Sequence, residues 1–224
     1  MGSTDNNTST TFMLTLTALF AAVLAVASWI SVPLPFTPVP VNLATLAVTL
    51  AGALLGCKYG TLSVLVYILL GAVGVPVFAG FTGGLGHLAG PTGGYIIGYL
   101  SSAFICGIIM DYFYPDVSSS KSHYSSASKP RLYPDDSSSK PHDSSSSKPL
   151  YFSASKPLVT VIAALLGTAS CYILGTAWFM ILTGNTLAAS MAMCIIPFLP
   201  GDVFKIASAA LIVPLIKKTL ARFR

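Results

Sequence analysis

The chain has 224 residues, of which 54% are hydrophobic and only 8% are charged, and it contains no glutamate. A soluble domain usually carries about 25% charged residues, so this composition excludes a soluble globular protein and indicates an integral membrane protein. The net charge of +5 comes from basic residues at the ends of apolar runs and in one polar segment, which indicates membrane topology rather than nucleic-acid binding.

Six apolar runs are candidates for crossing a bilayer, which takes about 20 residues. They are Phe12–Val32, Val41–Cys57, Tyr59–Ala79, Gly94–Phe113, Leu158–Thr183 and Met193–Ile216. Only Lys58 separates the second run from the third, so the sequence does not define where one helix ends and the next begins. The sequence therefore predicts an all-α membrane protein with six transmembrane helices, four in residues 12–113 and two in residues 158–218, forming one membrane domain.

Three segments fall outside this domain. Residues 1–11 are expected to be a disordered tail, and residues 219–224 a short basic tail. Residues 114–157 are rich in Ser, Lys, Pro and Asp, with Ser-Lys-Pro repeated along them. Such a composition cannot bury a core, so we expect a disordered, low-complexity insert. Phosphorylation of its serines and contact with anionic lipid headgroups remain open as its roles.

The basic residues predict the orientation in the membrane. Cytoplasmic loops carry an excess of Lys and Arg, so we place the basic C-terminal end in the cytoplasm. Six spans then put both termini, Lys58 and the polar insert on the cytoplasmic side. The outer loops, residues 33–40, 80–92 and 184–192, contain no Lys or Arg. We therefore expect a multi-pass protein of the plasma membrane, in contact with membrane lipid.

The glycine-rich stretch Phe78–Tyr99 lies between two apolar runs and contains neither Lys nor Arg. Glycine lets the backbone approach a ligand closely, and irregular backbone at membrane depth is tolerated where it lines a cavity. We interpret the stretch as one wall of a ligand site, with a plain connector as the alternative. Its His87 is expected to be a loop residue at the water interface; roles as a donor or a pH sensor are less favoured. The loop 33–40, with four prolines, is either a lid over the site or a turn.

Asp202 and Lys205 are the ionisable residues that break the apolar pattern, near the outer end of the last run. A charged group at the centre of a span costs about 2.5–3.5 kcal/mol on insertion scales, so such groups face a cavity or a partner. Three residues apart on a helix, the two share a face. They offer an acceptor and a donor to a neutral amide-like ligand or to one with a carboxylate. An ion pair with a purely structural role and a lipid-headgroup anchor are the alternatives.

The remaining features are weaker. Ala18 and Ala22 form a small-xxx-small pair that lets another helix approach. Tyr95, Tyr99, Tyr172 and Trp178 are candidates for stacking on a ligand, although each alone is more often a packing residue or an interface anchor. The sequence has no nucleophile–base set, metal cluster or phosphate loop, so we expect neither an enzyme nor a bound cofactor.

The residues Gly74–Tyr99, GVPVFAGFTGGLGHLAGPTGGYIIGY, resemble the signature of the BioY family. These proteins are the biotin-specific substrate-binding S components of energy-coupling factor transporters. The proline-rich loop, LVYILLGAVG and PFLPGDVFK resemble the same family at the same relative positions. The resemblance implies six helices, an outward-facing biotin site, and energy from a separate transmembrane coupling subunit and its ATPases.

The resemblance also assigns residues. It implies ligand contacts at Asp202, Lys205, Gly83, Gly84, Thr92 and Tyr95, and a surface for the coupling subunit at Ala18 and Ala22. Two departures stand out: a glutamine expected after the prolines is missing, and the polar insert lies on the side where coupling subunits dock. An S component for another vitamin, and a ligand-free channel or structural membrane protein, remain as alternative functions.

Overall fold

The computed structural model describes residues 4–35, 37–114 and 156–220, and this described part is mostly helical. The insert expected over residues 114–157 falls, apart from its two ends, outside the described residues. The same holds for the chain beyond residue 220.

The first helix, α1 (Thr4–Trp29), begins well before Phe12. The expectation of a disordered tail over residues 1–11 is therefore wrong from Thr4 onward. Extending an existing helix gains one backbone hydrogen bond for each residue that is fixed, whereas nucleation fixes several residues for the first bond. The helix that forms over the apolar span can therefore extend into the polar residues before it, although the composition of those residues does not predict a helix.

The proline-rich loop is a short antiparallel hairpin, formed by β1 (Ser31–Leu34) and β2 (Thr37–Asn42). The register shifts between Val32 and Leu34, which fits a ladder interrupted by prolines that cannot donate a hydrogen bond. β2 contacts both α1 and α6. The hairpin therefore links two parts of the helical assembly, a role that the sequence did not predict.

The second and third apolar runs are joined in one element, α2 (Ala44–Val73), with a sharp kink at Gly56. Gly56 has φ +79° and ψ −176°, a conformation that L side chains rarely adopt. A Cβ on Gly60 would lie 2.7 Å from the carbonyl oxygen of Ala51, whereas residues this far apart in a straight helix are separated by about 13 Å. The two arms, residues 44–55 and 57–73, therefore fold back on each other.

Next in the chain come a one-turn helix, α3 (Leu85–Ala89), and two long helices, α4 (Gly93–Phe113) and α5 (Lys156–Thr183). The bounds of these long helices agree with the expected fourth and fifth spans to within two residues. The two helices run antiparallel: Gly94 packs against Trp178, and Gly98 packs against Cys171. Small residues allow such close approach, which is the main means by which helices associate in lipid.

The last apolar run contains three elements, α6 (Leu187–Cys194), the 3-10 turn η2 (Ile196–Phe198) and α7 (Leu199–Leu220). The apolar run Met193–Ile216 is therefore not one continuous helix. Pro197 lies in η2, where its missing N–H and its ring disfavour a continuous helix. The break lets α7 begin at Leu199, which places Asp202 in its first turn.

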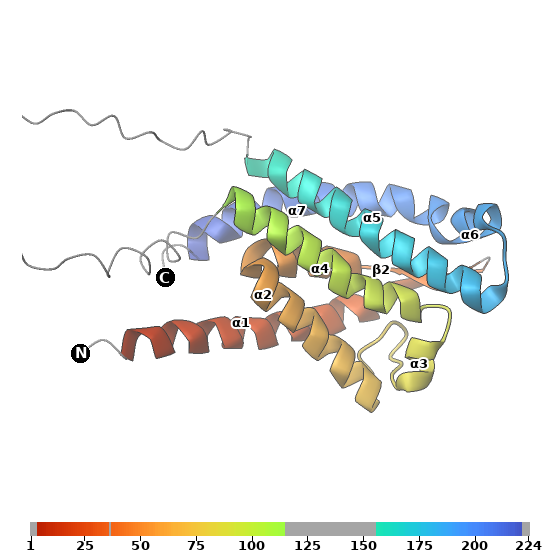
Figure 1. Cartoon of the computed structure of the whole chain (residues 1–224), viewed down its shortest axis with the longest axis horizontal. Helices are drawn as coiled ribbons and strands as arrows, with labels where there is room; N and C mark the ends of the chain where they lie inside the picture. Colours follow the sequence, from red (N-terminus) through yellow and green to blue (C-terminus); the bar gives the residue numbers. More distant parts are fainter. Residues whose placement is uncertain (1–3, 36, 115–155, 221–224) are drawn as a thin grey trace, which may run out of the picture.

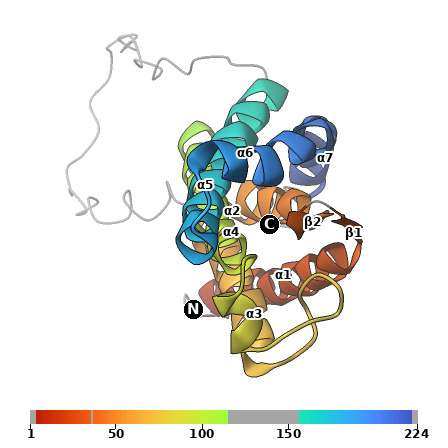
Figure 2. The same ribbon diagram turned by 90° about the vertical axis from the view of Figure 1, so that its right-hand side faces the viewer.

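In the described part of the chain, five helical segments are long and apolar enough to cross a membrane. They are Thr10–Trp29, Ala44–Val73, Gly93–Phe113, Pro157–Thr183 and Leu187–Thr219. The start of α1 and the end of α7 lie at one end of the molecule, and α3, α6 and the hairpin lie at the other (Figure 1). Figure 2 looks onto this second end, which we call the hairpin end.

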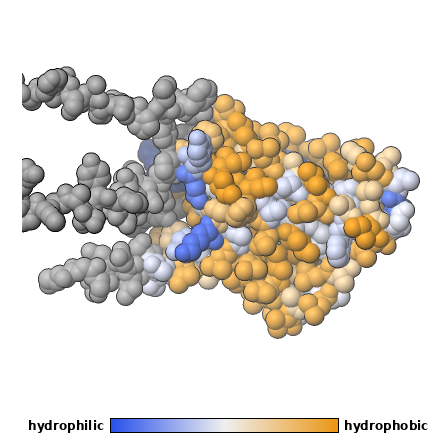
Figure 3. All heavy atoms as spheres, viewed as in Figure 1, coloured by the Kyte–Doolittle hydropathy of each residue, from blue (hydrophilic) through white to orange (hydrophobic). Residues whose placement is uncertain are grey.

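The outer surface is largely hydrophobic, with hydrophilic residues gathered mainly near the end that carries the two termini (Figure 3). Large apolar side chains such as Ile181, Phe204 and Leu211 are 70–79% exposed. Soluble monomers rarely expose apolar patches of this extent, so these side chains are suited to contact with lipid. Inside, the larger of two buried clusters includes Leu24, Val48, Tyr67 and Phe78, two of which also line the cavity described next.

Candidate ligand-binding site

A cavity of about 630 Å³, mouth included, lies among the elements at the hairpin end. Its walls come from β2, both ends of α2, the glycine-rich stretch, α4, α5, η2 and α7. The lining residues are Val39, Pro40, Asn42, Thr45, Tyr67, Phe78, Ala79, His87, Thr92, Tyr95, Ile96, Tyr99, Thr168, Cys171, Tyr172, Phe198, Asp202 and Lys205.

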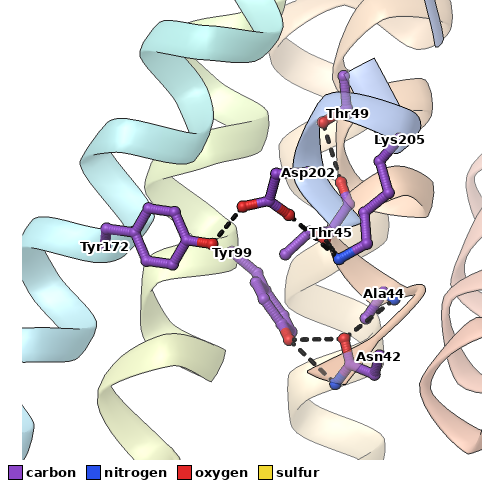
Figure 4. Close-up of polar contacts among 8 residues, drawn as sticks. All are labelled: Asn42, Ala44, Thr45, Thr49, Tyr99, Tyr172, Asp202 and Lys205. Atoms are coloured by element: carbon purple, nitrogen blue, oxygen red, sulfur yellow. Dashed lines mark hydrogen bonds and ion pairs between the residues drawn. The ribbon is translucent and has the colours of Figure 1, made fainter. Parts of the chain in front are cut away.

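Asp202 and Lys205 both line this cavity, as the sequence predicted, and they form an ion pair in the first turns of α7 (Figure 4). Lys205 Nζ lies 3.2 Å from Asp202 Oδ1. The residues are only 6% and 8% exposed. Charges so deeply buried are costly unless they are paired and hydrogen-bonded. The pair therefore faces the cavity rather than lipid, which contradicts the alternative of a lipid-headgroup anchor. The alternative of a structural ion pair is compatible with the observed contact.

Two further side chains fix this pair from other helices. Tyr172 on α5 donates a hydrogen bond to Asp202 Oδ2, and Lys205 Nζ donates to Thr45 Oγ1 on α2 at 2.9 Å. Each Asp202 oxygen thus accepts from the protein, and Lys205 uses two of its three donors. The result is a polar chain, Tyr172–Asp202–Lys205–Thr45, that presents an oriented carboxylate and an oriented ammonium group to the cavity.

A second polar contact lies beside this chain. Asn42 at the end of β2 is within 3.4 Å of the Tyr99 hydroxyl through both amide atoms, and its Oδ1 accepts from the Ala44 N–H at 3.1 Å. Ala44, at the place of the expected glutamine, is fully buried. Polar contacts in this corner are therefore made by Asn42 and Thr45. Neither was predicted as a site residue, because only the fold brings β2 and α2 beside α4 and α7.

The glycine-rich stretch does form one wall, as predicted. Phe78, His87, Thr92 and Tyr95 are among its lining residues. The prediction of a loop position for His87 at the water interface missed its place in the cavity. Its ring stacks on Phe78 with centroids 5.5 Å apart, and its nitrogens lie 3.2 Å from the hydroxyls of Thr82 and Thr92. Burial lowers the pKa of His87, so the ring is neutral near pH 7.

Gly83 and Gly84 do not line the cavity. A Cβ on Gly83 would run into the backbone at Val75, and Gly84 has φ +95° and donates to the Gly71 carbonyl at 2.6 Å. These glycines close the loop back onto the end of α2. Their positions explain the need for glycine by backbone conformation and close approach, without any contact to a ligand.

Away from the cavity, Ala18 and Ala22 are exposed on one face of α1, while Ala21 and Ala25 are buried against the rest of the protein. The outward pair is thus accessible to another helix or to lipid. Among the described residues, no group of three His, Cys, Asp or Glu side chains could hold a metal ion.

The family model of the BioY family matches residues 3–222. This chain belongs to the BioY family. It is 50% identical over 93 residues to the "Biotin transporter BioY" of Thermotoga maritima, a match that covers 42% of this chain and 54% of the relative. It is 53% identical over 93 residues to the "Probable biotin transporter BioY" of Pyrococcus horikoshii, covering 42% of this chain and 56% of that one. Its matches thus span about half the length of these curated relatives.

Among solved structures, this BioY chain resembles the S-component for biotin from an ECF-type ABC transporter. The TM-score is 0.71 at 26% sequence identity, and the match covers 95% of this chain and 94% of the other. Membership of the BioY family confirms the resemblance found in the sequence. It also agrees with the expected multi-pass protein of the cell membrane.

Proposed function

We propose that this BioY protein binds biotin in the cavity at the hairpin end and acts as the substrate-binding component of a biotin uptake system. The observation that carries the proposal is the buried Asp202–Lys205 pair, held from two sides by Tyr172 and Thr45. The names of the relatives and of the similar solved structure support it.

The chemistry of biotin fits these groups. Its ureido ring carries N–H donors for the Asp202 carboxylate and a carbonyl that can accept from the third Lys205 donor. Hydrogen bonds to charged groups in a buried site are strong, and both partners are already desolvated and oriented. Aromatic and apolar walls, including Tyr67, Phe78 and Tyr95, suit a bicyclic ring with an aliphatic chain. Thr92 and Tyr95 remain proposed ligand contacts.

The decisive experiment is equilibrium binding of radiolabelled biotin to the purified protein. Asp202→Asn and Lys205→Ala should each weaken binding by about 1–3 kcal/mol, because each leaves a buried polar partner unsatisfied. Ser208→Ala on the same helix, outside the cavity lining, is the matched control. Saturable binding of another vitamin in preference to biotin would favour an S component for that vitamin. If no small molecule binds saturably, the result favours the channel or structural alternative.

We also propose six transmembrane helices, with the two arms of α2 crossing separately and both termini in the cytoplasm. The backbone folds back at Gly56, and the start of α1 lies on the same side of the molecule as the end of α7. This arrangement suits an even number of crossings. Lys58 is exposed at the kink. In a cysteine-free background, Lys58→Cys should react with an impermeant thiol reagent only from the cytoplasmic side. Labelling from outside, or no labelling in permeabilised cells, contradicts this topology.

Finally, we propose that Ala18 and Ala22 contact the transmembrane coupling subunit of an energy-coupling factor, whose ATPases supply the energy. The exposed small-xxx-small face and the similarity to a component of an ECF-type transporter support this. Ala18→Trp and Ala22→Trp should reduce co-purification of the coupling subunit and leave biotin binding intact. Ile181→Trp, at an exposed site on α5, is the control. Equal co-purification in all variants contradicts this surface.

A further inference from the structure

His87 lies in a chain of three side chains along the glycine-rich wall. Its Nδ1 is 3.2 Å from Thr82 Oγ1, and its Nε2 is 3.2 Å from Thr92 Oγ1. The Thr82 hydroxyl also donates to the Ala79 carbonyl at 2.9 Å. Thr92 lines the cavity and precedes α4 as its N-cap residue. The chain thus links a titratable ring to a hydroxyl group at the cavity surface.

The Thr92 hydroxyl is the group in this chain whose role depends on the protonation of His87. In the neutral tautomer that carries its proton on Nδ1, Nε2 has a lone pair and accepts the proton of the Thr92 hydroxyl. In that tautomer Thr92 is turned toward His87 and has no proton to donate into the cavity. The Thr82 hydroxyl donates its one proton to the Ala79 carbonyl, and its oxygen lies beside both ring nitrogens, 3.2 Å from Nδ1 and 3.5 Å from Nε2.

We propose that His87 and Thr92 form a proton-linked subsite for the carboxylate of the ligand. When Nε2 gains a proton, it donates to Thr92 Oγ1, and the Thr92 hydroxyl is free to donate to an anion in the cavity with the imidazolium charge behind it. The amino end of α4 adds a favourable dipole for an anion. The inference rests on the proposed function, because the carboxylate is that of the biotin side chain, and it assigns the ureido ring to the Asp202 end.

The other titratable groups around the cavity do not duplicate this behaviour. They are Tyr67 on α2, Tyr95 and Tyr99 on α4, Cys171 and Tyr172 on α5, and Asp202 with Lys205 on α7. Tyrosine and cysteine titrate above about pH 8 in reference peptides, and Asp202 and Lys205 are bonded to each other. Burial lowers the pKa of His87, and a bound carboxylate raises it again. Ligand binding should therefore take up protons at pH values between the His87 pKa of the free protein and that of the complex.

Calorimetric titration of the purified protein with biotin and with biotin amide tests this subsite. Measurements from pH 5.5 to 8, in two buffers with different ionisation enthalpies, give affinity and proton uptake together. The range stays above about pH 5, where free carboxyl groups begin to titrate. We expect biotin affinity to rise roughly 3- to 10-fold between pH 8 and 5.5, as for a new charge-assisted contact, with net proton uptake. Biotin amide, which lacks the carboxylate, should show neither effect.

Two variants locate the effect. His87→Gln keeps hydrogen-bonding capacity without a titrating charge, so it should abolish the proton uptake and the rise in affinity. Thr92→Val keeps the shape and removes the hydroxyl, so it should reduce the rise at low pH. Biotin binding in the unmodified protein without proton uptake, or with the same pH dependence as the amide, overturns the subsite and leaves the proposed function standing. Absence of binding by both ligands overturns both.

Discussion

The buried ion pair shows how single residues combine stability with binding. Removing one partner leaves an uncompensated charge, which costs about 3–5 kcal/mol, whereas removing both can be nearly neutral. We therefore expect Lys205→Met to lower the thermal stability of the ligand-free protein strongly, because Asp202 keeps only the Tyr172 bond. The double variant Asp202→Asn/Lys205→Met should recover most of this loss, although neither should bind biotin well.

Thermal unfolding in detergent measures the first effect, and biotin binding measures the second. Ser208→Ala again controls for changes elsewhere on α7. Additive losses of stability in the double variant contradict a pair that is coupled in the folded state.

His87 predicts a pH dependence of stability in the ligand-free protein. Its pKa is lowered by burial, so between about 6.5 and that lower value the unfolded chain binds more protons than the folded one. Stability should thus be greatest above about pH 6.5 and fall as the pH decreases through this window. Melting temperatures at pH 7.5 and 5.5 test it, and His87→Gln should reduce the difference between them. A larger drop in the variant contradicts the assignment.

The site shows what the sequence can and cannot predict at this scale. Asp202 and Lys205 were found because a charge in an apolar span is costly and therefore needs a reason. Thr45, Asn42 and His87 carry no such signal, since their residue types are common in loops and helix ends. Lys205 and Thr45 lie 160 positions apart, so their contact depends on the packing of α7 against α2.

At the scale of elements, the kink in α2 depends on Gly56 and Asp111. Asp111 Oδ2 accepts from the Cys57 N–H at 2.8 Å, which caps the second arm, and its carboxylate occupies the space where a Gly56 Cβ would lie. Gly56→Ala should therefore destabilise the protein by more than the roughly 1–3 kcal/mol of an alanine forced into this glycine-only region of backbone conformation, because it also displaces the cap.

Thermal unfolding of Gly56→Ala, compared with Asp111→Ala, measures this effect. Asp111→Ala should cost about 0.5–2 kcal/mol, the usual loss for a cap. Gly86→Ala in α3 is the matched control, because a Cβ there meets nothing within 4 Å. Equal stability of the Gly56 and Gly86 variants contradicts a kink that requires glycine.

Helix positions were predictable where apolar length was the only requirement, as for α4 and α5. The errors lie where local chemistry competes with it. The hairpin β1–β2 was missed because prolines disfavour strands in general, although edge pairing tolerates them. The break at Pro197 divides the last apolar run, and the kink at Gly56 lies inside a helix that joins the second and third runs. Hydropathy is high on both sides of each position, so composition alone could not locate them.

For the whole molecule, the cavity depends on residues on both sides of the polar insert in the chain. The last lining residue before the insert is Tyr99 and the first after it is Thr168. α4 and α5 pack directly through Gly98 and Cys171, and the end of α4 and the start of α5 lie on the same side of the molecule (Figure 1). The insert is therefore not needed to bring the two halves of the site together.

Replacing residues 115–155 by a short Gly/Ser linker should leave biotin affinity within about threefold, which corresponds to less than 1 kcal/mol. Stability should rise slightly, since each halving of a flexible loop recovers about 0.6 kcal/mol of closure entropy. Measurements of biotin binding and of the melting temperature of the shortened protein test both expectations, with a scrambled insert of equal length as the control.

If the insert obstructs the coupling subunit at the cytoplasmic face, the shortened protein should co-purify more of that subunit than the scrambled control does. Loss of biotin binding by a well-folded shortened protein contradicts a site made by the helices and hairpin alone.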